Sequence, residues 1–509
     1  MLFKQASFAI VYCRMLSISP FTDGILMDSF DLDVESWAEQ NFGDCDFNDK
    51  RLTKRLVAYA AAAARSPDDK TTHQTQTWKD CKGAYRFMDN EKVSFEKIVK
   101  PHCNRTKKLA CAGVYLSICD TTEISFRPRR TIDGLRPVGS GTGQGFFLHT
   151  SLLVSDSSDE IIGIAGQELF YRIDSKEKEN TAKRKQRERE SEVWGRVVDS
   201  IGPPQSGAFI IHVCDREADD YDFFGHLVQN NVGWIVRASR LNRLVFRKST
   251  ESIPAAPAKS QSLASILDAQ PSLGTYELSL RENRESPARI AKVQVRCANI
   301  WMPRPVASSP WSKQHAPAYI AMGVVEVREI NVKKGVEPVH WVLYTHERVY
   351  TFEDGWRVIS RYEKRPLIEE YHKAAKTGAQ IEERYYRTAA RLERIAGILS
   401  IVAVRILKMK TIAKREPNRL AKGVAPRKWI EAMCAIQRLQ FPNQKSLYDP
   451  RTITLRDFLR GIAKLGGFLG RKSDGEPGWI TIWRGVKDLL QSLRLQRALR
   501  DLSDDETCG

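Results

Sequence analysis

Long hydrophobic runs are missing from this chain of 509 residues. No uninterrupted stretch reaches the roughly 18 apolar residues that a membrane-spanning helix needs, so no membrane partner is expected. The mild apolar stretch at residues 6–12 is too short for a secretory signal and lacks a small-residue cleavage site. We therefore expect residues 1–27 to be a disordered leader, or a start assigned too early, with Met27 as the true initiator.

Paired cysteines are also missing. The ten cysteines are scattered and form no CxxC pair, which argues against a zinc site and a disulfide framework. Reduced thiols in a cytoplasm fit best. The glycine-rich residues 139–145 lack the Lys-Ser/Thr of a phosphate loop, so we interpret them as a flexible hairpin connection.

Acidic residues are fewer than basic residues in this chain. The chain has 62 acidic and 80 basic residues, a net charge of +18. Such an excess favours a polyanionic partner, and without a membrane segment the better candidate is nucleic acid. The length suggests about three domains.

Residues 28–108 have a helical pattern. Basic side chains follow one helix of this region, namely Arg51, Lys54 and Arg55. In a basic protein these residues favour a helical domain that binds DNA ends, although a solvated helix surface is the simpler alternative.

Strand patterns begin at Gly113. Five apolar runs are predicted strands, at residues 114–119, 146–154, 161–171, 208–214 and 234–238. A charged run at 176–189, continuing to Trp194, is a predicted helix before the fourth strand, and a second helix precedes the fifth. This order is that of a ribonuclease-H-like sheet, in which the first and fourth strands are neighbours.

The predicted fold class is therefore α/β, with the ribonuclease-H-like catalytic core over residues 109–395. Further strand patterns at 275–280, 290–297, 319–327 and 340–344 indicate a β-strand insertion at about 244–345. Residues 396–500 are predicted to be helical, with apolar faces that usually pack on another domain or subunit. The acidic tail at 501–509 is expected to be disordered. The predicted catalytic core is thus flanked by an all-α N-terminal domain and a helical C-terminal region.

Three carboxylates stand out within this layout. Asp120 and Asp215 each follow a buried strand, at the sheet edge where α/β folds build their sites. Glu369 shares one side of a predicted helix with Tyr362, Arg365, Lys373 and Lys376, and Pro366 suits a first helical turn. Together the three acids could hold Mg²⁺ or Mn²⁺. The alternatives are turn or cap aspartates and a solvent-facing ladder of ion pairs.

The spacing Tyr362-x2-Arg365-x3-Glu369-x6-Lys376 resembles the YREK signature of the insertion-sequence-four family of bacterial DDE transposases. Residues 215–219 and 120–122 are similar to the blocks around that family's two aspartates. The resemblance runs from about Trp37 to the end of the chain. The leader has no counterpart, and Pro366 and Leu367 replace more polar or aromatic residues.

The resemblance implies roles for particular residues. Asp120, Asp215 and Glu369 would be the catalytic triad, binding two Mg²⁺ or Mn²⁺ ions per active site. Tyr362, Arg365 and Lys376 would contact the DNA backbone near the cut, with Arg237 and Lys373 as further DNA contacts. Trp341 would stack on an unpaired base, unless it is a core residue of the insertion.

The function implied is cut-and-paste transposition of double-stranded DNA. A homodimer, helped by a C-terminal dimerisation region, would hold two transposon ends and join them to target DNA beside the bacterial nucleoid. Two other readings stay open. A catalytically inactive copy would bind DNA and inhibit transposition, and a host nuclease of the same fold would cut RNA–DNA hybrids.

Overall fold

The structure is a computed structural model that describes residues 34–506 apart from short internal gaps. The gaps are residues 76, 127–131, 140–142, 174–188, 249–258, 281–288, 333–334, 423–424, 426, 444–447 and 472–473. The expected leader at 1–27 lies outside the described residues, as do most of the charged run at 176–189 and the middle of the glycine-rich segment.

The N-terminal region is helical, as predicted. Polar residues begin three of its helices, because the side chains of Asp49, Thr77 and Ser94 each accept a hydrogen bond from a first-turn backbone N–H. The helices are α2 (Val34–Phe42), α3 (Lys50–Arg65), α4 (Thr71–Gln74), α5 (Trp78–Met88) and α6 (Phe95–Leu109).

The central sheet contains the five predicted strands. They are β1 (Gly113–Phe126), β3 (Gly143–Ser155), β4 (Ile161–Phe170), β5 (Ala208–Cys214) and β6 (Gly233–Arg237), with the short β2 (Arg136–Val138) beside β3. β3 pairs antiparallel with β1 and β4, whereas β5 pairs in parallel with β1 and β6. The prediction that the first and fourth strands are neighbours is confirmed. The connections hold η1 (Glu190–Glu192), α8 (Val193–Ile201), η2 (Arg216–Ala218) and α9 (Tyr221–Gln229).

The inserted strands extend this sheet. β12 pairs antiparallel with β6, and the ladder continues through β11, β10 and β7 to β8, with β9 on β10. The elements are β7 (Leu244–Arg247), β8 (Gln261–Ser262), α10 (Leu263–Asp268), β9 (Gly274–Leu280), β10 (Arg289–Pro303), α11 (Pro310–His315), β11 (Tyr319–Glu329) and β12 (His340–Thr345).

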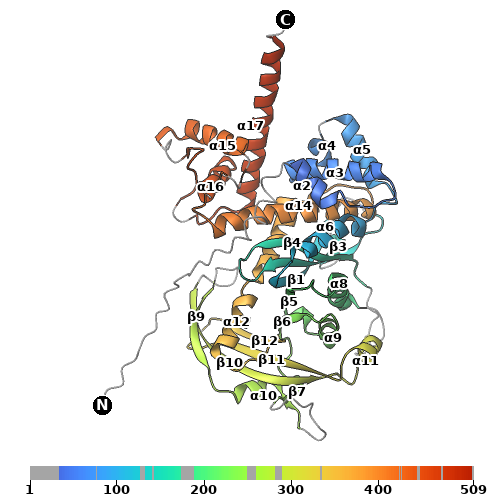
Figure 1. Cartoon of the computed structure of the whole chain (residues 1–509), viewed down its shortest axis with the longest axis vertical. Helices are drawn as coiled ribbons and strands as arrows, with labels where there is room; N and C mark the ends of the chain where they lie inside the picture. Colours follow the sequence, from blue (N-terminus) through green and yellow to red (C-terminus); the bar gives the residue numbers. More distant parts are fainter. Residues whose placement is uncertain are drawn as a thin grey trace, which may run out of the picture.

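Two apolar cores cover the two faces of the sheet. Leu116 and Ile118 of β1 point into a core shared with the N-terminal helices and α14, whereas Tyr115 and Cys119 point into a core with α8 and α9. This alternation is that of a strand buried on both sides. Figure 1 shows α14 lying between helices α2–α5 and the sheet, with α6 on the sheet side of α14.

The helix predicted to carry Glu369 is in fact three segments. α12 (Phe352–Tyr362) ends before Arg365, α13 (Pro366–Lys373) begins at Pro366, and a π-helical turn, η3 (Ala374–Gly378), follows. Pro366 does occupy the first turn of a helix, as expected. The short η4 (Ile381–Glu383) leads into α14.

The C-terminal region is helical. It comprises α14 (Ala389–Arg415), α15 (Arg427–Gln440), α16 (Leu455–Leu465) and α17 (Trp479–Glu506). The expectation of a disordered tail from residue 501 is wrong for its first part, because α17 continues to Glu506 and projects from the body in Figure 1. No helix in the described part of the chain is long and apolar enough to cross a membrane.

Candidate active site

Strand pairing brings Asp120 and Asp215 together. Ile118 of β1 is in parallel register with Val213 of β5. Asp120 lies two residues further along β1, and Asp215 lies two residues after Val213, directly beyond the end of β5. Because strand side chains alternate, both aspartates point to the face that holds Ile118 and Val213. Asp215 also caps η2, where its Oδ1 accepts a hydrogen bond of 2.9 Å from the Glu217 N–H.

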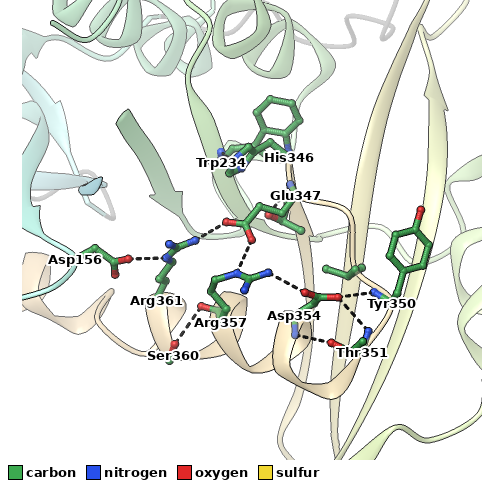
Figure 2. A network of polar contacts seen from close by, with 12 residues as sticks. Asp156, Trp234, His346, Glu347, Tyr350, Thr351, Asp354, Arg357, Ser360 and Arg361 are labelled. Atoms are coloured by element: carbon green, nitrogen blue, oxygen red, sulfur yellow. Dashed lines mark hydrogen bonds and ion pairs between the residues drawn. The ribbon is translucent and has the colours of Figure 1, made fainter. Parts of the chain in front are cut away.

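Ion pairs fix α12 across the sheet. Figure 2 shows Arg361 between Asp156, which follows β3, and Glu347, which follows β12. Lys364 adds a hydrogen bond of 2.8 Å to the Asp156 carbonyl. These contacts hold the junction between α12 and α13 against the sheet, and Arg365 and Glu369 follow directly from it.

All three candidate carboxylates meet the guanidinium of Arg365. Its Nη2 lies 3.1 Å from Asp120 Oδ2 and 3.2 Å from Asp215 Oδ2, and its Nη1 lies 2.8 Å from Glu369 Oε1. Glu369 is the most open of the acids, with half of its side chain exposed (50%). The structure thus gathers the predicted triad from β1, the end of β5 and α13.

Burial and charge act against each other in this cluster. Burial raises the pKa of Asp120 to about 6, with a smaller rise from Asp215, although Arg365 lowers it. Burial disfavours the charged form of Arg365, but attraction to Asp120 and Asp215 prevails and raises its pKa. The guanidinium is therefore firmly charged, and it offsets part of the negative charge of the three acids.

The donor chemistry of the triad fits a divalent cation, since carboxylate oxygens are the ligands that Mg²⁺ and Mn²⁺ prefer. The spacing is a different matter. Within the residues that the structure describes, no group of three or more His, Cys, Asp or Glu side chains is arranged closely enough to hold a metal ion. The triad here is arranged around a guanidinium.

Tyr362, Trp341 and Arg237 form a second cluster beside the triad. Tyr362 is only 6% exposed, and its ring meets the edge of Trp341 at 5.5 Å between centroids. Trp341 is partly buried against the core, and Arg237 interacts with Tyr362 and donates a hydrogen bond of 3.1 Å to the His340 carbonyl. Tyr362 thus contacts both Trp341 and Arg237.

The two lysines predicted to contact DNA near Glu369 face other partners. Lys373, on α13, is 3.2 Å from Glu370, and Lys376, in η3, is 3.4 Å from Glu382. The prediction that Lys376 continues the helix of Glu369 is wrong in detail, because the π-helical turn begins at Ala374.

The three basic residues of α3 that were predicted to bind DNA differ in exposure. Arg51 is largely exposed and pairs with Asp49 at 2.9 Å, and Lys54 is also exposed. Arg55 instead lies over Gly83 of α5, where a Cβ would overlap its guanidinium. Of the three, Arg51 and Lys54 are exposed on the surface and Arg55 is not.

Sequence reasoning missed two neighbours of the triad. Glu217 donates its N–H to Asp215, and burial, with Asp215 second, raises the pKa of its carboxyl. His149 of β3 is 2.8 Å from the Thr121 hydroxyl. Glu217 could have been found from its place two residues after Asp215, whereas His149 carries no local pattern.

The second aspartate of the same block has a structural task. Asp219 is buried and accepts hydrogen bonds from the backbone N–H (2.7 Å) and the hydroxyl (2.8 Å) of Ser239. It also pairs with Arg243 at 2.6 Å. Asp215 is therefore a residue of the candidate site, whereas Asp219 anchors η2 to the chain beyond β6.

Comparison with known families gives matches at both ends of the chain. Residues 34–93 match the transposase DNA-binding family, and residues 401–506 match the Transposase Tn5 dimerisation domain. The carboxylate site lies between the two matched segments. DNA and a second copy of this chain are the partners that these domains support. The two matches support the family that the sequence resembles, the Tn5-like transposases of the insertion-sequence-four family.

Proposed function

We propose that the chain is a cut-and-paste DDE transposase with a ribonuclease-H-like catalytic core. The observation that carries this proposal is the convergence of Asp120, Asp215 and Glu369 within 3.2 Å of one cation, the Arg365 guanidinium. Three carboxylates from three separate elements repel one another, so bringing them together does not by itself stabilise the fold. A site that binds cations explains why they converge.

Asp120, Asp215 and Glu369 would hold Mg²⁺ or Mn²⁺, two ions per active site, and when bound these ions supply an activated water and stabilise the leaving oxygen of a phosphodiester. The basic side chains have a separate task. Arg365, Lys373 and Lys376 would hold phosphates of the transposon end, because charged N–H donors pair well with phosphate oxygens. Arg51 and Lys54, which point outward from α3, would bind DNA further from the cut.

The proposed reaction begins with hydrolysis of one strand at each transposon end. The freed 3′-hydroxyl attacks the opposite strand and forms a hairpin, which is reopened before the 3′-hydroxyls join target DNA. Each step is an in-line displacement at phosphorus, so one set of carboxylates serves them all. A dimer would hold two ends together in the bacterial cytoplasm.

The test compares two adjacent glutamates of α13. Glu369→Gln removes one acid of the triad, whereas Glu370→Gln, the matched control, removes one that pairs with Lys373 and Lys410 at 3.2 and 3.0 Å. Purified protein is mixed with Mg²⁺ and duplexes carrying the terminal inverted repeats that flank this gene. We expect wild type and Glu370→Gln to give nicks and hairpins at the repeat boundary, and Glu369→Gln and Asp215→Asn to bind without cutting.

Two other results carry clear meaning. Cleavage retained by Asp215→Asn or Glu369→Gln would remove the acids from the mechanism. Binding without cleavage by the wild type, in Mg²⁺ and in Mn²⁺, would favour an inactive copy that inhibits transposition.

A further inference from the structure

The cation at the centre of the triad belongs to the chain itself. Arg365 reaches Asp120 and Asp215 with one nitrogen and Glu369 with another, and 15% of its side chain is exposed. Three carboxylates around one guanidinium leave an excess of negative charge. This excess is the electrostatic condition under which a divalent cation competes with an arginine.

The contacts of Arg365 are incomplete. A guanidinium has five N–H donors, and the buried Nε of Arg365 has no hydrogen-bond partner in the structure. A buried donor without a partner costs free energy. A phosphate offers paired oxygens that suit the guanidinium fork better than three separate carboxylates do.

The backbone allows the side chain to move alone. Arg365 lies at the junction of α12 and α13, and Pro366 begins α13 without needing the Arg365 side chain as a cap. Lys364 and Arg361 hold the junction to Asp156 on the other side. A change of Arg365 rotamer therefore breaks none of the contacts that hold the junction of α12 and α13.

We propose that Arg365 is the resident cation of the acidic triad in the DNA-free protein and that it excludes divalent metal until DNA phosphate draws it away. The inference rests on the proposed function and adds regulation to the same site. Metal and DNA then bind with positive coupling, because each favours the state in which Arg365 has left the carboxylates. Metal-dependent chemistry is thereby restricted to protein that already holds DNA.

The experiment measures Mn²⁺ binding to the DNA-free full-length protein by electron paramagnetic resonance of free Mn²⁺, at constant ionic strength. Arg365→Gln removes the competing charge, and we expect it to bind Mn²⁺ about tenfold more tightly than wild type. Lys410→Gln is the matched control: it removes one positive charge that pairs with Glu370 at 3.0 Å, away from the triad, and should leave the affinity unchanged. Asp215→Asn, added to Arg365→Gln, should abolish the gain.

A second measurement keeps the test valid if Arg365→Gln folds poorly. Addition of a transposon-end duplex should raise the Mn²⁺ affinity of the wild type. The same duplex should raise the Mn²⁺ affinity of Arg365→Lys less, because lysine offers no planar fork to a phosphate. Cooperative unfolding of Arg365→Lys would show that this variant is folded. Equal or weaker Mn²⁺ binding by a folded Arg365→Gln, or no effect of the duplex on the wild type, overturns the inference. It does so without touching the proposed function, which falls if cleavage survives loss of the triad or if the wild type binds DNA without cutting it.

Discussion

At the scale of the residue, His102 shows how burial sets the ionisation of a side chain. Its Nδ1 lies 2.7 Å from Asn41 Oδ1 of α2, and its Nε2 accepts the Ile164 N–H of β4 at 3.1 Å. Burial first, and then the charges of Lys408 and Arg105, lower the pKa of His102 to about 3, from an ordinary value of 6.5. A ring that accepts at Nε2 must be neutral, so the hydrogen bonds agree with the direction of the shift.

This arrangement predicts acid sensitivity. Because the pKa of His102 is lower in the folded state, its contribution to stability is present above pH 6.5 and is lost as the pH falls from 6.5 towards 3. At pH 5 the loss is about 2 kcal/mol. A His102→Gln variant keeps a donor and an acceptor without the titration, so its urea midpoint should fall less between pH 7.5 and pH 5. Identical falls in the two proteins would contradict the assignment.

At the scale of the element, α12 is held by two arginines one turn apart, and they differ in burial. Arg361 is 9% exposed and pairs with Asp156 at 2.8 Å and with Glu347, whereas the Arg357 side chain is 46% exposed and pairs with Glu347 at 2.9 Å and Asp354 at 2.8 Å. Figure 2 shows the two sharing Glu347. Breaking a buried pair leaves an unpaired charge, but breaking an exposed pair does not.

We therefore expect unequal effects from equal truncations. Arg361→Ala should lower the free energy of unfolding by about 3 kcal/mol, and Arg357→Ala, the control, by less than about 1 kcal/mol. Urea unfolding of both variants measures the difference. Since α12 leads to Arg365 and Glu369, DNA cleavage by Arg361→Ala should fall more than its DNA binding. Similar losses of stability in both variants would show that the buried ion pairs of Arg361 do not hold α12 in place.

Some elements could be predicted from sequence and others could not. β5 and the first half of β1 could, because the runs at residues 208–214 and 114–119 are short and apolar, and an acidic residue follows each. The expectation that Asp120 lies just past its strand is wrong, because β1 continues to Phe126. The break after Tyr362 could be predicted only in part. Pro366 indicates the first turn of a helix, but the spacing of Tyr362, Arg365 and Glu369 is also compatible with one continuous helix. The pairing of Arg361 and Lys364 with Asp156, which holds the end of α12, had no sequence signal because Asp156 is more than 200 residues away.

The candidate site, like the fold, could be predicted from sequence only in part. That Asp120 and Asp215 would meet followed from strand order, and Glu369 from the signature. The place of Arg365 at their centre did not follow, because the signature suggests an outward DNA contact. Only the packing of α13 on β1 brings this arginine to Asp120, across 245 positions of sequence.

At the scale of the whole molecule, one apolar core runs from the N-terminal helices through the sheet to the C-terminal helices. Arg384 and α17 add polar links between these regions. Arg384 is buried and donates hydrogen bonds to the carbonyls of Pro67 and Asp69, and Lys487 of α17 lies 2.9 Å from the Asp69 carboxylate. The matched DNA-binding and dimerisation segments are therefore connected by direct contacts as well as through the sheet.

Attachment of α17 depends on two glycines where it crosses the end of α16. A Cβ added to Gly485 would overlap the Ile462 carbonyl oxygen, and one added to Gly466 would overlap that of Thr481. Alanine normally favours a helix over glycine by about 1 kcal/mol. Here the backbone contact leaves no room, so Gly485→Ala should instead weaken the packing of α17 by about 1–3 kcal/mol.

The measurement is trypsin cleavage within α17 of the full-length protein, since proteolysis of a transiently opened segment follows the free energy of opening. We expect cleavage of Gly485→Ala to be about tenfold faster than that of wild type, the factor that 1.4 kcal/mol gives. Gly478→Ala is the control, because a Cβ at this position meets nothing within 4 Å. If the variant dimerises less in sedimentation as well, the crossing of α16 and α17 supports both the fold of one chain and its association with the next. If Gly485→Ala is cut no faster than Gly478→Ala, α17 does not depend on this crossing.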